Sequence, residues 1–358
     1  MKDYSLIIKE LSSIYDNDSM DTFVSLYYNG KDEKFIRKRE RICSAILEGE
    51  ELENFVKTMK KIRKFIEGSA KKIAIFASHR NDYFRVVPLS ADITLDIPNA
   101  LIVDSSPYIR PLTEAIEEWK SFTLLLMNSN HAKIFSISHG EITEEKKMSA
   151  DIMNKHKKGG WSQARFQRIR KGEIHSFFSE IADALHHFAG ENIILAGPGY
   201  AKMQFRNSLP TALQKKIIGV IDVDINDEKD LLKESAELMN KREKKEKSQA
   251  IQQFKKEILK DGLAIYGIME TMEAIKNGQA EAVLIEKDYK LKGWICENCQ
   301  IVKKGYTKIC PYCGKKTSEV DVIEEIIEFA ERMETQIKFI DDEEIKKIGH
   351  VGALLRYK

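Results

Sequence analysis

The sequence has no run of 18 or more apolar residues, so no segment could cross a bilayer as a helix. Its first residues, Met-Lys-Asp-Tyr, lack the apolar stretch of a secretory signal peptide. It also lacks a large charge of one sign, because 58 lysines and arginines face 56 aspartates and glutamates. A surface that binds nucleic acid must therefore be local. We expect a cytoplasmic protein with no membrane partner.

Cysteine is scarce, and its placement does not suit a disulfide framework. Four of the five cysteines form two Cys-x-x-Cys pairs, while Cys43 stands alone. Such pairs suit a reducing compartment and a metal ion. Four thiolates complete a tetrahedral site and leave no position for water, so the sequence predicts a structural Zn²⁺ rather than a catalytic one. The predicted ligands are Cys296, Cys299, Cys310 and Cys313.

The usual nucleotide-binding loops are also absent. Gly197-Pro198-Gly199 follows an apolar segment, but the chain contains no Gly-Lys-Ser/Thr and no Gly-x-Gly-x-x-Gly. These glycines therefore indicate a turn between a strand and a helix. No arrangement of nucleophile, histidine and acid rises above chance.

What the chain does contain is a basic segment around two glycines, residues 155–171. It holds seven lysines and arginines in seventeen positions and no acidic residue, which is the electrostatic pattern of a phosphate-binding surface. Two adjacent glycines give its backbone unusual freedom. Apolar residues then recur every three to five positions up to Phe188, as on one face of a helix. A basic surface loop before an amphipathic helix is an alternative interpretation.

This segment resembles the catalytic loop and following helix of the archaeal and eukaryotic class I peptide-chain release factors. Their pattern is a basic run, Gly-Gly-Gln, and then Ser, Ala and Arg-Phe. Here two residues separate Gly160 from Gln163, and this Gly-x-x-Gln spacing is similar to that of the ribosome-rescue branch. The stop-codon signatures Asn-Ile-Lys-Ser and Tyr-x-Cys-x-x-x-Phe are absent from residues 1–118.

The resemblance implies a factor that promotes peptidyl-tRNA hydrolysis in the ribosomal peptidyl-transferase centre. Its catalytic residues would be Gln163, Gly159 and Gly160, and its partners the ribosome, peptidyl-tRNA, ribosomal RNA and an elongation-factor-like GTPase bound by the C-terminal domain. A stop-codon-dependent release factor is the alternative. A non-catalytic ribosome-splitting adaptor and a tRNA nuclease are further alternatives. The expected RNA-binding residues are Lys155, His156, Lys157, Lys158, Trp161, Arg165, Arg168, Arg170 and Lys171.

The order of predicted helices and strands gives an α/β and α+β protein with a three-domain, release-factor-like architecture. Residues 1–118 form an α/β domain whose basic run at positions 31–41 either contacts ribosomal RNA or is a solvated helix face. Residues 119–226 form the domain that carries the Gly-Gly-Trp-Ser-Gln loop. Residues 227–358 begin with a long charged helix and contain a zinc ribbon at 294–316. The expected strands include 22–28, 72–77, 83–87, 100–103, 122–127, 132–137, 193–196, 216–223, 282–285 and 336–340.

Overall fold

The computed structural model shows two compact units. One is formed by residues 119–244, and the other by residues 2–118 together with residues 245–358. Among the described residues, no helix has the length and apolarity to span a membrane. The structure describes residues 4–16, 21–31, 33–67, 72–89, 97–118, 121–138, 141–152, 161–188, 190–224, 228–296 and 298–358.

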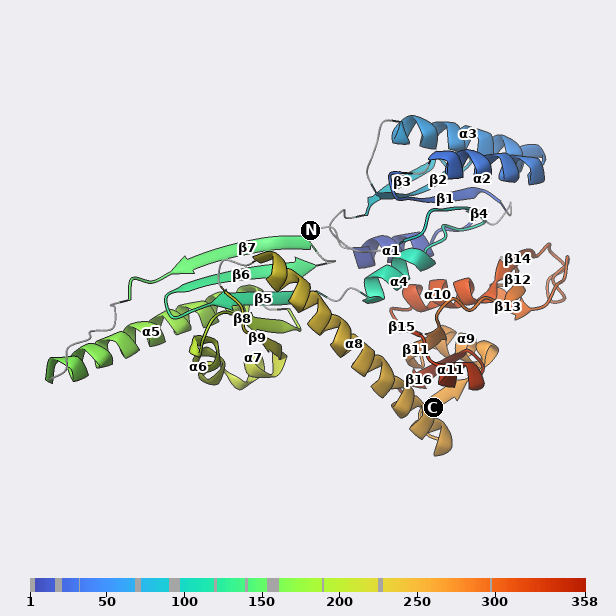
Figure 1. The fold of residues 1–358 in the computed structure, drawn as a ribbon. Coiled ribbons are helices and arrows are strands. Elements are labelled where there is room, and N and C mark those ends of the chain that lie inside the picture. The colour runs from blue at the N-terminus through green and yellow to red at the C-terminus, as the bar shows by residue number, and fades with distance from the viewer. Residues whose placement is uncertain are drawn as a thin grey trace. The chain divides into compact units, whose positions relative to one another are not determined.

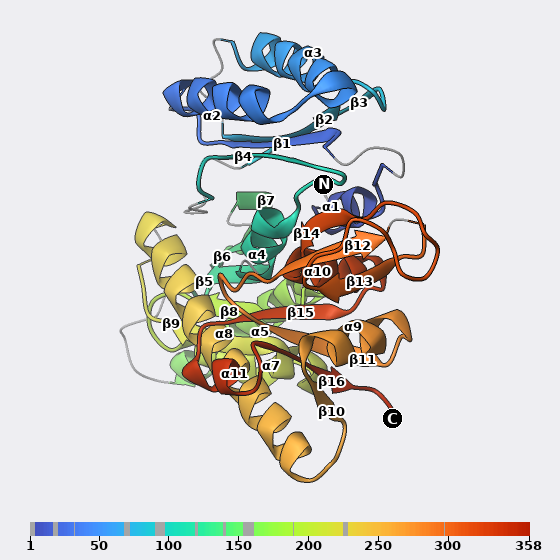
Figure 2. The same cartoon turned by 90° about the vertical axis from the view of Figure 1, so that its right-hand side faces the viewer.

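The N-terminal residues build a four-stranded antiparallel sheet with strand order β3-β2-β1-β4 (Figures 1 and 2). Side chains alternate between its faces, so Ile73 and Ile75 pack with the helices α2 and α3, whereas Ala74 and Phe76 pack on the opposite side. Both central strands are therefore buried throughout. The elements are α1 (Tyr4–Ser12), β1 (Phe23–Tyr28), α2 (Glu33–Ile46), α3 (Gly49–Ile66), β2 (Ile73–Ser78), β3 (Tyr83–Pro88), β4 (Ala100–Asp104) and α4 (Arg110–Glu118).

The unit of residues 119–244 contains a five-stranded mixed sheet with order β7-β6-β5-β8-β9. Strands β5, β8 and β9 run parallel, and β5, β6 and β7 run antiparallel. The helices α5, α6 and α7 cover one face, and the first turns of α8 cover the other. The elements are β5 (Phe122–Met127), β6 (His131–Ser138), β7 (Glu141–Ser149), α5 (Trp161–Phe188), β8 (Ile193–Ala196), α6 (Ala201–Ser208), α7 (Thr211–Lys216), β9 (Ile217–Ile221) and α8 (Glu228–Leu259).

The C-terminal residues form a second four-stranded sheet, order β10-β16-β11-β15, in which only β11 and β15 pair in parallel among the described strands. The end of α8 and α11 pack on one face, and α9 and α10 on the other. A small antiparallel sheet, β13-β12-β14, is inserted before α10. The elements are β10 (Ala264–Tyr266), α9 (Ile268–Lys276), β11 (Ala280–Glu286), β12 (Lys292–Cys296), β13 (Ile301–Lys304), β14 (Ser318–Asp321), α10 (Val322–Arg332), β15 (Gln336–Ile340), α11 (Glu343–Lys347) and β16 (Val351–Leu355).

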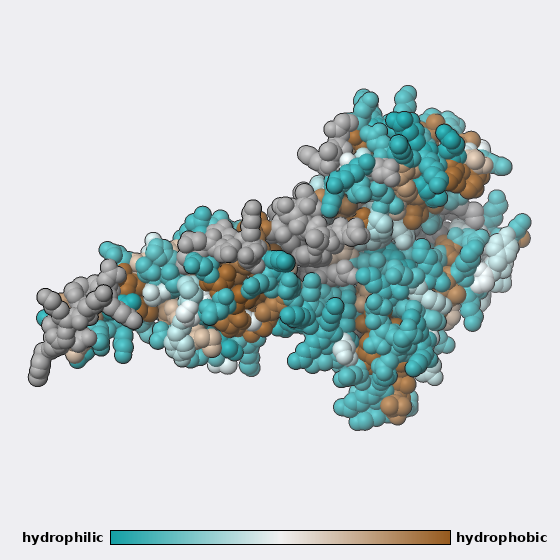
Figure 3. Space-filling view, viewed as in Figure 1, coloured by the Kyte–Doolittle hydropathy of each residue, from teal (hydrophilic) through white to brown (hydrophobic). Residues whose placement is uncertain are grey.

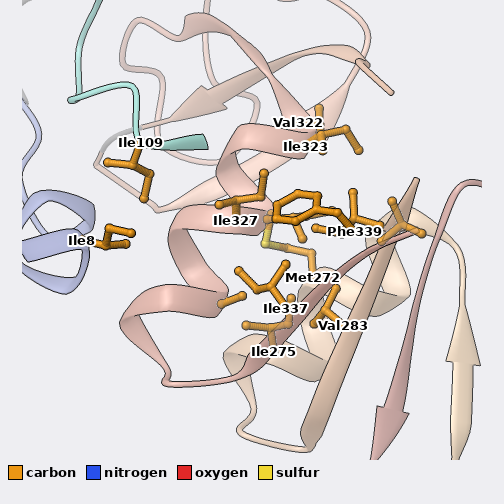
Figure 4. Packing of buried hydrophobic residues seen from close by; sticks show 14 of the residues in the cluster. Ile8, Ile109, Met272, Ile275, Val283, Val322, Ile323, Ile327, Ile337 and Phe339 are labelled. Carbon is orange, nitrogen blue, oxygen red and sulfur yellow. The ribbon is translucent and has the colours of Figure 1, made fainter. Parts of the chain in front are cut away.

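The first and last parts of the chain share one hydrophobic core. Figure 4 shows Ile8 and Ile109, from the N-terminal part, directed toward Ile327 on α10. Polar contacts reinforce this packing, since the Ser106 hydroxyl donates to Glu328 at 2.8 Å and Lys247 pairs with Glu117 at 2.7 Å. Residues 2–118 and 245–358 therefore form a single folded body.

The predicted mixture of helices and strands is confirmed, with some local differences. The strand expected at 216–223 is shorter, because α7 continues to Lys216 and β9 covers only Ile217–Ile221. Strand β7 was not predicted, since its Glu-Ile-Thr-Glu-Glu-Lys-Lys sequence lacks apolar alternation. It lies at the edge of the sheet, where charged side chains are tolerated and discourage pairing with other chains.

Candidate functional site

Helix α5 begins at Trp161, directly after the two glycines of the basic segment. The backbone from Trp161 to Gln163 is therefore helical, whereas the sequence pattern predicts a loop for these residues. The first four backbone N–H groups of a helix have no partner within that helix. Gln163 is the third residue of α5, so its N–H is one of these free donors, at the positive end of the helix dipole.

The first half of α5 is exposed, and the second half anchors it to the sheet. Arg165, Arg168 and Lys171 are exposed at intervals of three residues, so they form a basic stripe along the first turns. From Phe177 onward, one face of the helix is buried against β5 and β6. Figure 1 shows the first turns of α5 extending past the strands of its own unit. Arg170, also expected to bind RNA, is half-buried.

Part of the predicted site lies outside the described residues, namely Lys155, His156, Lys157, Lys158, Gly159 and Gly160. For Trp161, Ser162 and Gln163 the structure describes the backbone alone.

The turn after β8 is held by a buried lysine that no sequence signal marks. Lys202 on α6 donates to the carbonyl oxygens of Gly197 and Gly199 at 2.7 and 2.8 Å and pairs with Asp222 at 2.9 Å. A Cβ at Gly197 would lie 1.8 Å from the Met127 carbonyl oxygen, and the φ of Gly197 is +138°, so only glycine fits. Carbonyl oxygens that face a lysine form a structural turn and not a phosphate loop.

The four paired cysteines come together beside the small β13-β12-β14 sheet. All four sulfur atoms lie within 4.8 Å of one another, and those of Cys296 and Cys313 are 3.5 Å apart. Four sulfurs at the usual zinc distance of about 2.3 Å would be separated by roughly 3.8 Å. Trp294 packs against Cys296 and Cys310 and shields one side of the cluster. The cluster can bind a metal ion, and its donors are the soft ligands that zinc prefers.

The backbone around each Cys-x-x-Cys pair has the same form. The N–H of Gln300 donates to the Cys296 carbonyl at 2.7 Å, and the N–H of Gly314 donates to the Cys310 carbonyl at 2.9 Å. The residue after each second cysteine has a positive φ, +53° at Gln300 and +74° at Gly314. A backbone N–H from Lys315 is the main reason that the pKa of Cys313 falls to about 6, which favours the thiolate that binds metal.

The basic run of the N-terminal part lies on α2, facing solvent. Lys34, Arg37, Lys38 and Arg41 are exposed, while Arg39 donates to the Leu101 carbonyl at 3.0 Å. The outer surface over α2 and α3 is mainly hydrophilic (Figure 3). This surface is compatible with either interpretation of the run, an RNA contact or a solvated helix face.

Two family profiles together match most of the chain beyond its first 106 residues. The profile described as bacterial archaeo-eukaryotic release factor family 10 matches residues 107–241, which include α5. The profile described as eRF1 domain 3 matches residues 244–358. These sequence matches define the class of release factors.

The sequence of one release factor agrees with these two profiles. Peptide chain release factor subunit 1 of Thermococcus kodakarensis is 30% identical over 293 residues, which is 71% of this chain and 70% of the relative. The chain belongs to the archaeo-eukaryotic release factor superfamily.

Solved structures of the same class have low superposition scores. Dom34 of S. cerevisiae, described as a translation termination-like factor involved in RNA quality control pathways and interacting with Hbs1, is 12% identical with a TM-score of 0.42 and covers 80% of this chain and 84% of its own. A model of ribosome-bound archaeal Pelota and ABCE1 is 15% identical with a TM-score of 0.41, covering 99% of this chain and 94% of that one. The family membership rests on the sequence matches and not on these superpositions.

Proposed function

We propose that the protein is a ribosome-rescue factor that promotes hydrolysis of peptidyl-tRNA in the ribosomal peptidyl-transferase centre. The observation that carries the proposal is the position of Gln163 in the first turn of α5, where two residues separate it from Gly160 and an exposed basic stripe follows it. This arrangement can carry uncharged hydrogen-bond donors and acceptors into an RNA-lined cavity. The ribosome and peptidyl-tRNA are its partners in this proposal.

In the proposed reaction, water attacks the ester carbonyl that joins the peptide to tRNA. Negative charge then develops on the carbonyl oxygen, and the free N–H groups at the start of α5 are suited to stabilise it. Gln163 acts through its backbone N–H or its side-chain amide, which can also orient the water. Phosphates are bound by the basic residues of the segment, Lys155, His156, Lys157, Lys158, Arg165, Arg168, Arg170 and Lys171, and Trp161 stacks on a base.

Three functional domains fit this proposal, residues 1–118, 119–226 and 227–358. The last boundary falls just before α8, whose first turns pack with the central sheet and whose last turns pack with the C-terminal sheet. We propose that the C-terminal domain binds an elongation-factor-like GTPase. Its cysteine cluster, Cys296, Cys299, Cys310 and Cys313, would hold a structural Zn²⁺ as a zinc ribbon, and the metal would fix the loops around it.

The decisive experiment is single-turnover peptide release with saturating factor. Gln163→Ala should lower the rate by on the order of 10²-fold, the effect of removing one oriented donor from a preorganised site. Trp161→Ala should have a smaller effect. Sedimentation with ribosomes is the control, because binding depends on the separate basic residues and should survive. Full activity of Gln163→Ala would leave the segment as a phosphate clamp without a catalytic role.

A stop-codon-dependent release factor is the second candidate, favoured by the identity with peptide chain release factor subunit 1. Release from matched complexes with a stop or a sense codon separates the two. We expect similar rates, because residues 1–118 lack both stop-codon signatures. A preference above about tenfold for stop codons, which is roughly 1.4 kcal/mol, would favour the second candidate.

A further inference from the structure

The loops around the cysteine cluster have an unusual composition. Residues 300–317 contain five lysines, two tyrosines and no aspartate or glutamate. The lysines are exposed, and none forms an ion pair with a carboxylate in the described part of the chain. We call the exposed basic and apolar side chains of these loops the ribbon patch: Lys303, Lys304, Tyr306, Lys308, Ile309, Tyr312, Lys315 and Lys316.

Large apolar side chains are exposed among these lysines. Tyr306, Tyr312 and Ile309 are 67%, 61% and 60% exposed, although the adjacent Trp294 and Cys310 are buried. The Lys303 ammonium lies 6.0 Å from the ring centre of Tyr312. The small core around the cysteines is already buried without these three side chains. Large apolar side chains that stay exposed together often mark a binding surface, so their exposure points to a partner that covers them.

The charge of a bound zinc ion does not account for all the lysines. A zinc ion with four thiolates carries a net charge of about −2. Five lysines exceed that charge, and Lys315 already donates to the Asn298 amide oxygen at 2.6 Å. The excess positive charge is available to phosphates.

Beside the ribbon patch lies a cavity of about 780 Å³. Tyr306, Lys308, Ile309 and Lys316 line one side. The lining also includes Asp21 and Asp104 from the N-terminal part of the same unit, together with Glu319. These carboxylates would repel a phosphate deep in the cavity, whereas a neutral base can enter it. A nucleotide would therefore bind with its phosphates on Lys308 and Lys316 and its base against Tyr306.

We propose that the ribbon patch is a binding site for a short segment of single-stranded RNA. Lysines neutralise phosphates irrespective of sequence, and tyrosine rings stack on bases that are not paired. Regular double-stranded RNA does not offer its bases in this way. The inference deepens the proposed function, because it gives the factor a second RNA contact, separate from α5, but it does not depend on hydrolysis.

The test measures binding of a fluorescein-labelled, 12-nucleotide single-stranded RNA to the zinc-loaded full chain by fluorescence anisotropy. All proteins carry Arg165→Ala and Arg168→Ala, so that α5 contributes less. Lys308→Ala with Lys316→Ala should raise the Kd roughly tenfold and reduce the salt slope by about 1.4, or 0.7 per lost phosphate contact. Tyr306→Ala should raise the Kd about tenfold, and Tyr306→Phe should restore binding.

The matched control is Lys260→Ala with Lys347→Ala, which removes the same charge from exposed positions outside the patch. It should change the Kd less than threefold. Equal losses in the control, or no effect of Tyr306→Ala, would overturn the proposal, as would a parent protein that does not bind RNA. Zinc content verifies that each variant keeps its fold. The two proposals can fail independently. Gln163→Ala should lose peptide release and keep RNA binding at the ribbon patch, whereas the ribbon-patch variants should lose RNA binding without requiring any change in hydrolysis.

Discussion

Arg110 is the strongest polar link between the first and last parts of the chain, and its removal has a calculable cost. Its side chain is 4% exposed, pairs with Glu114 at 2.7 Å and Glu324 at 3.2 Å, and donates to the Tyr289 carbonyl at 3.0 Å. Arg110→Met keeps much of the volume but leaves Glu324 without its ion-pair partner. Removing one partner of a buried pair generally costs about 3–5 kcal/mol.

The cost should depend on pH. Burial raises the pKa of Glu324, and the guanidinium of Arg110 opposes that rise. With Arg110 present the pKa of Glu324 is still raised to about 8, so the carboxyl is neutral at pH 5 with or without Arg110. Near and above pH 8 the variant loses the ionised form that Arg110 stabilises, which costs about 0.4 kcal/mol at pH 8 and about 1.4 kcal/mol at pH 9. With the lost hydrogen bonds, we expect Arg110→Met to destabilise this body by about 1–2 kcal/mol at pH 5 and roughly 3 kcal/mol at pH 9.

Native-state hydrogen exchange over α10 measures this loss locally, which avoids assuming that the two units unfold together. Arg110→Met with Glu324→Leu should recover much of the stability lost at pH 9, because the buried Glu324 carboxyl is no longer present. Arg85→Met is the control, since its pair with Glu10 at 3.4 Å is exposed and worth at most about 1 kcal/mol. A cost that does not change with pH, or a double variant no more stable than Arg110→Met, would refute the reasoning.

Two further predictions follow from the same body. Elemental analysis of the purified protein should find one zinc per chain. Cys310→Ser should remove the zinc and lower the Tm, whereas the control Cys43→Ala on α2 should retain the zinc. Burial raises the pKa of Glu328 to about 8 from 4.5, so the stability of its protonated form is present below pH 4.5 and is lost as the pH rises through 8. Glu328→Gln should therefore make the free energy of unfolding less dependent on pH between 5 and 8 and raise it by about 1–3 kcal/mol at pH 8. Urea unfolding measures this, with the exposed Glu334→Gln as the control, and an unchanged pH profile would contradict the prediction.

Much of the local structure could be predicted because it depends on short-range patterns. The apolar strand at 122–127 matches β5, and the run of 282–285 lies within β11. The long charged segment forms α8, as its helix-favouring composition predicts. The spacing of the cysteines identified the four side chains that come together. Each Cys-x-x-Cys turn already holds two sulfurs close together, so the cluster forms when the two turns meet.

The start of α5 was predicted less well. Apolar periodicity first becomes visible at Phe166, because the five residues before it contribute no repeating apolar face. The helix nevertheless begins at Trp161, which makes the N–H of Gln163 a helix N-terminal donor. Periodicity reports the buried face of a helix and cannot detect turns that extend past the core.

The sequence by itself determined the family, the cysteine cluster and most elements, since each is encoded in residues close together or in a motif. Only the tertiary structure decided that residues 2–118 and 245–358 share one core. No local pattern could pair Arg110 with Glu324 or Ser106 with Glu328, which are more than 200 residues apart in the chain. Likewise, the cavity beside Tyr306 exists because the ribbon loops meet Asp21 and Asp104. Such contacts form when the surfaces of helices and sheets pack together. Shape complementarity and burial of the whole surfaces determine which residues meet, and these depend on the complete fold.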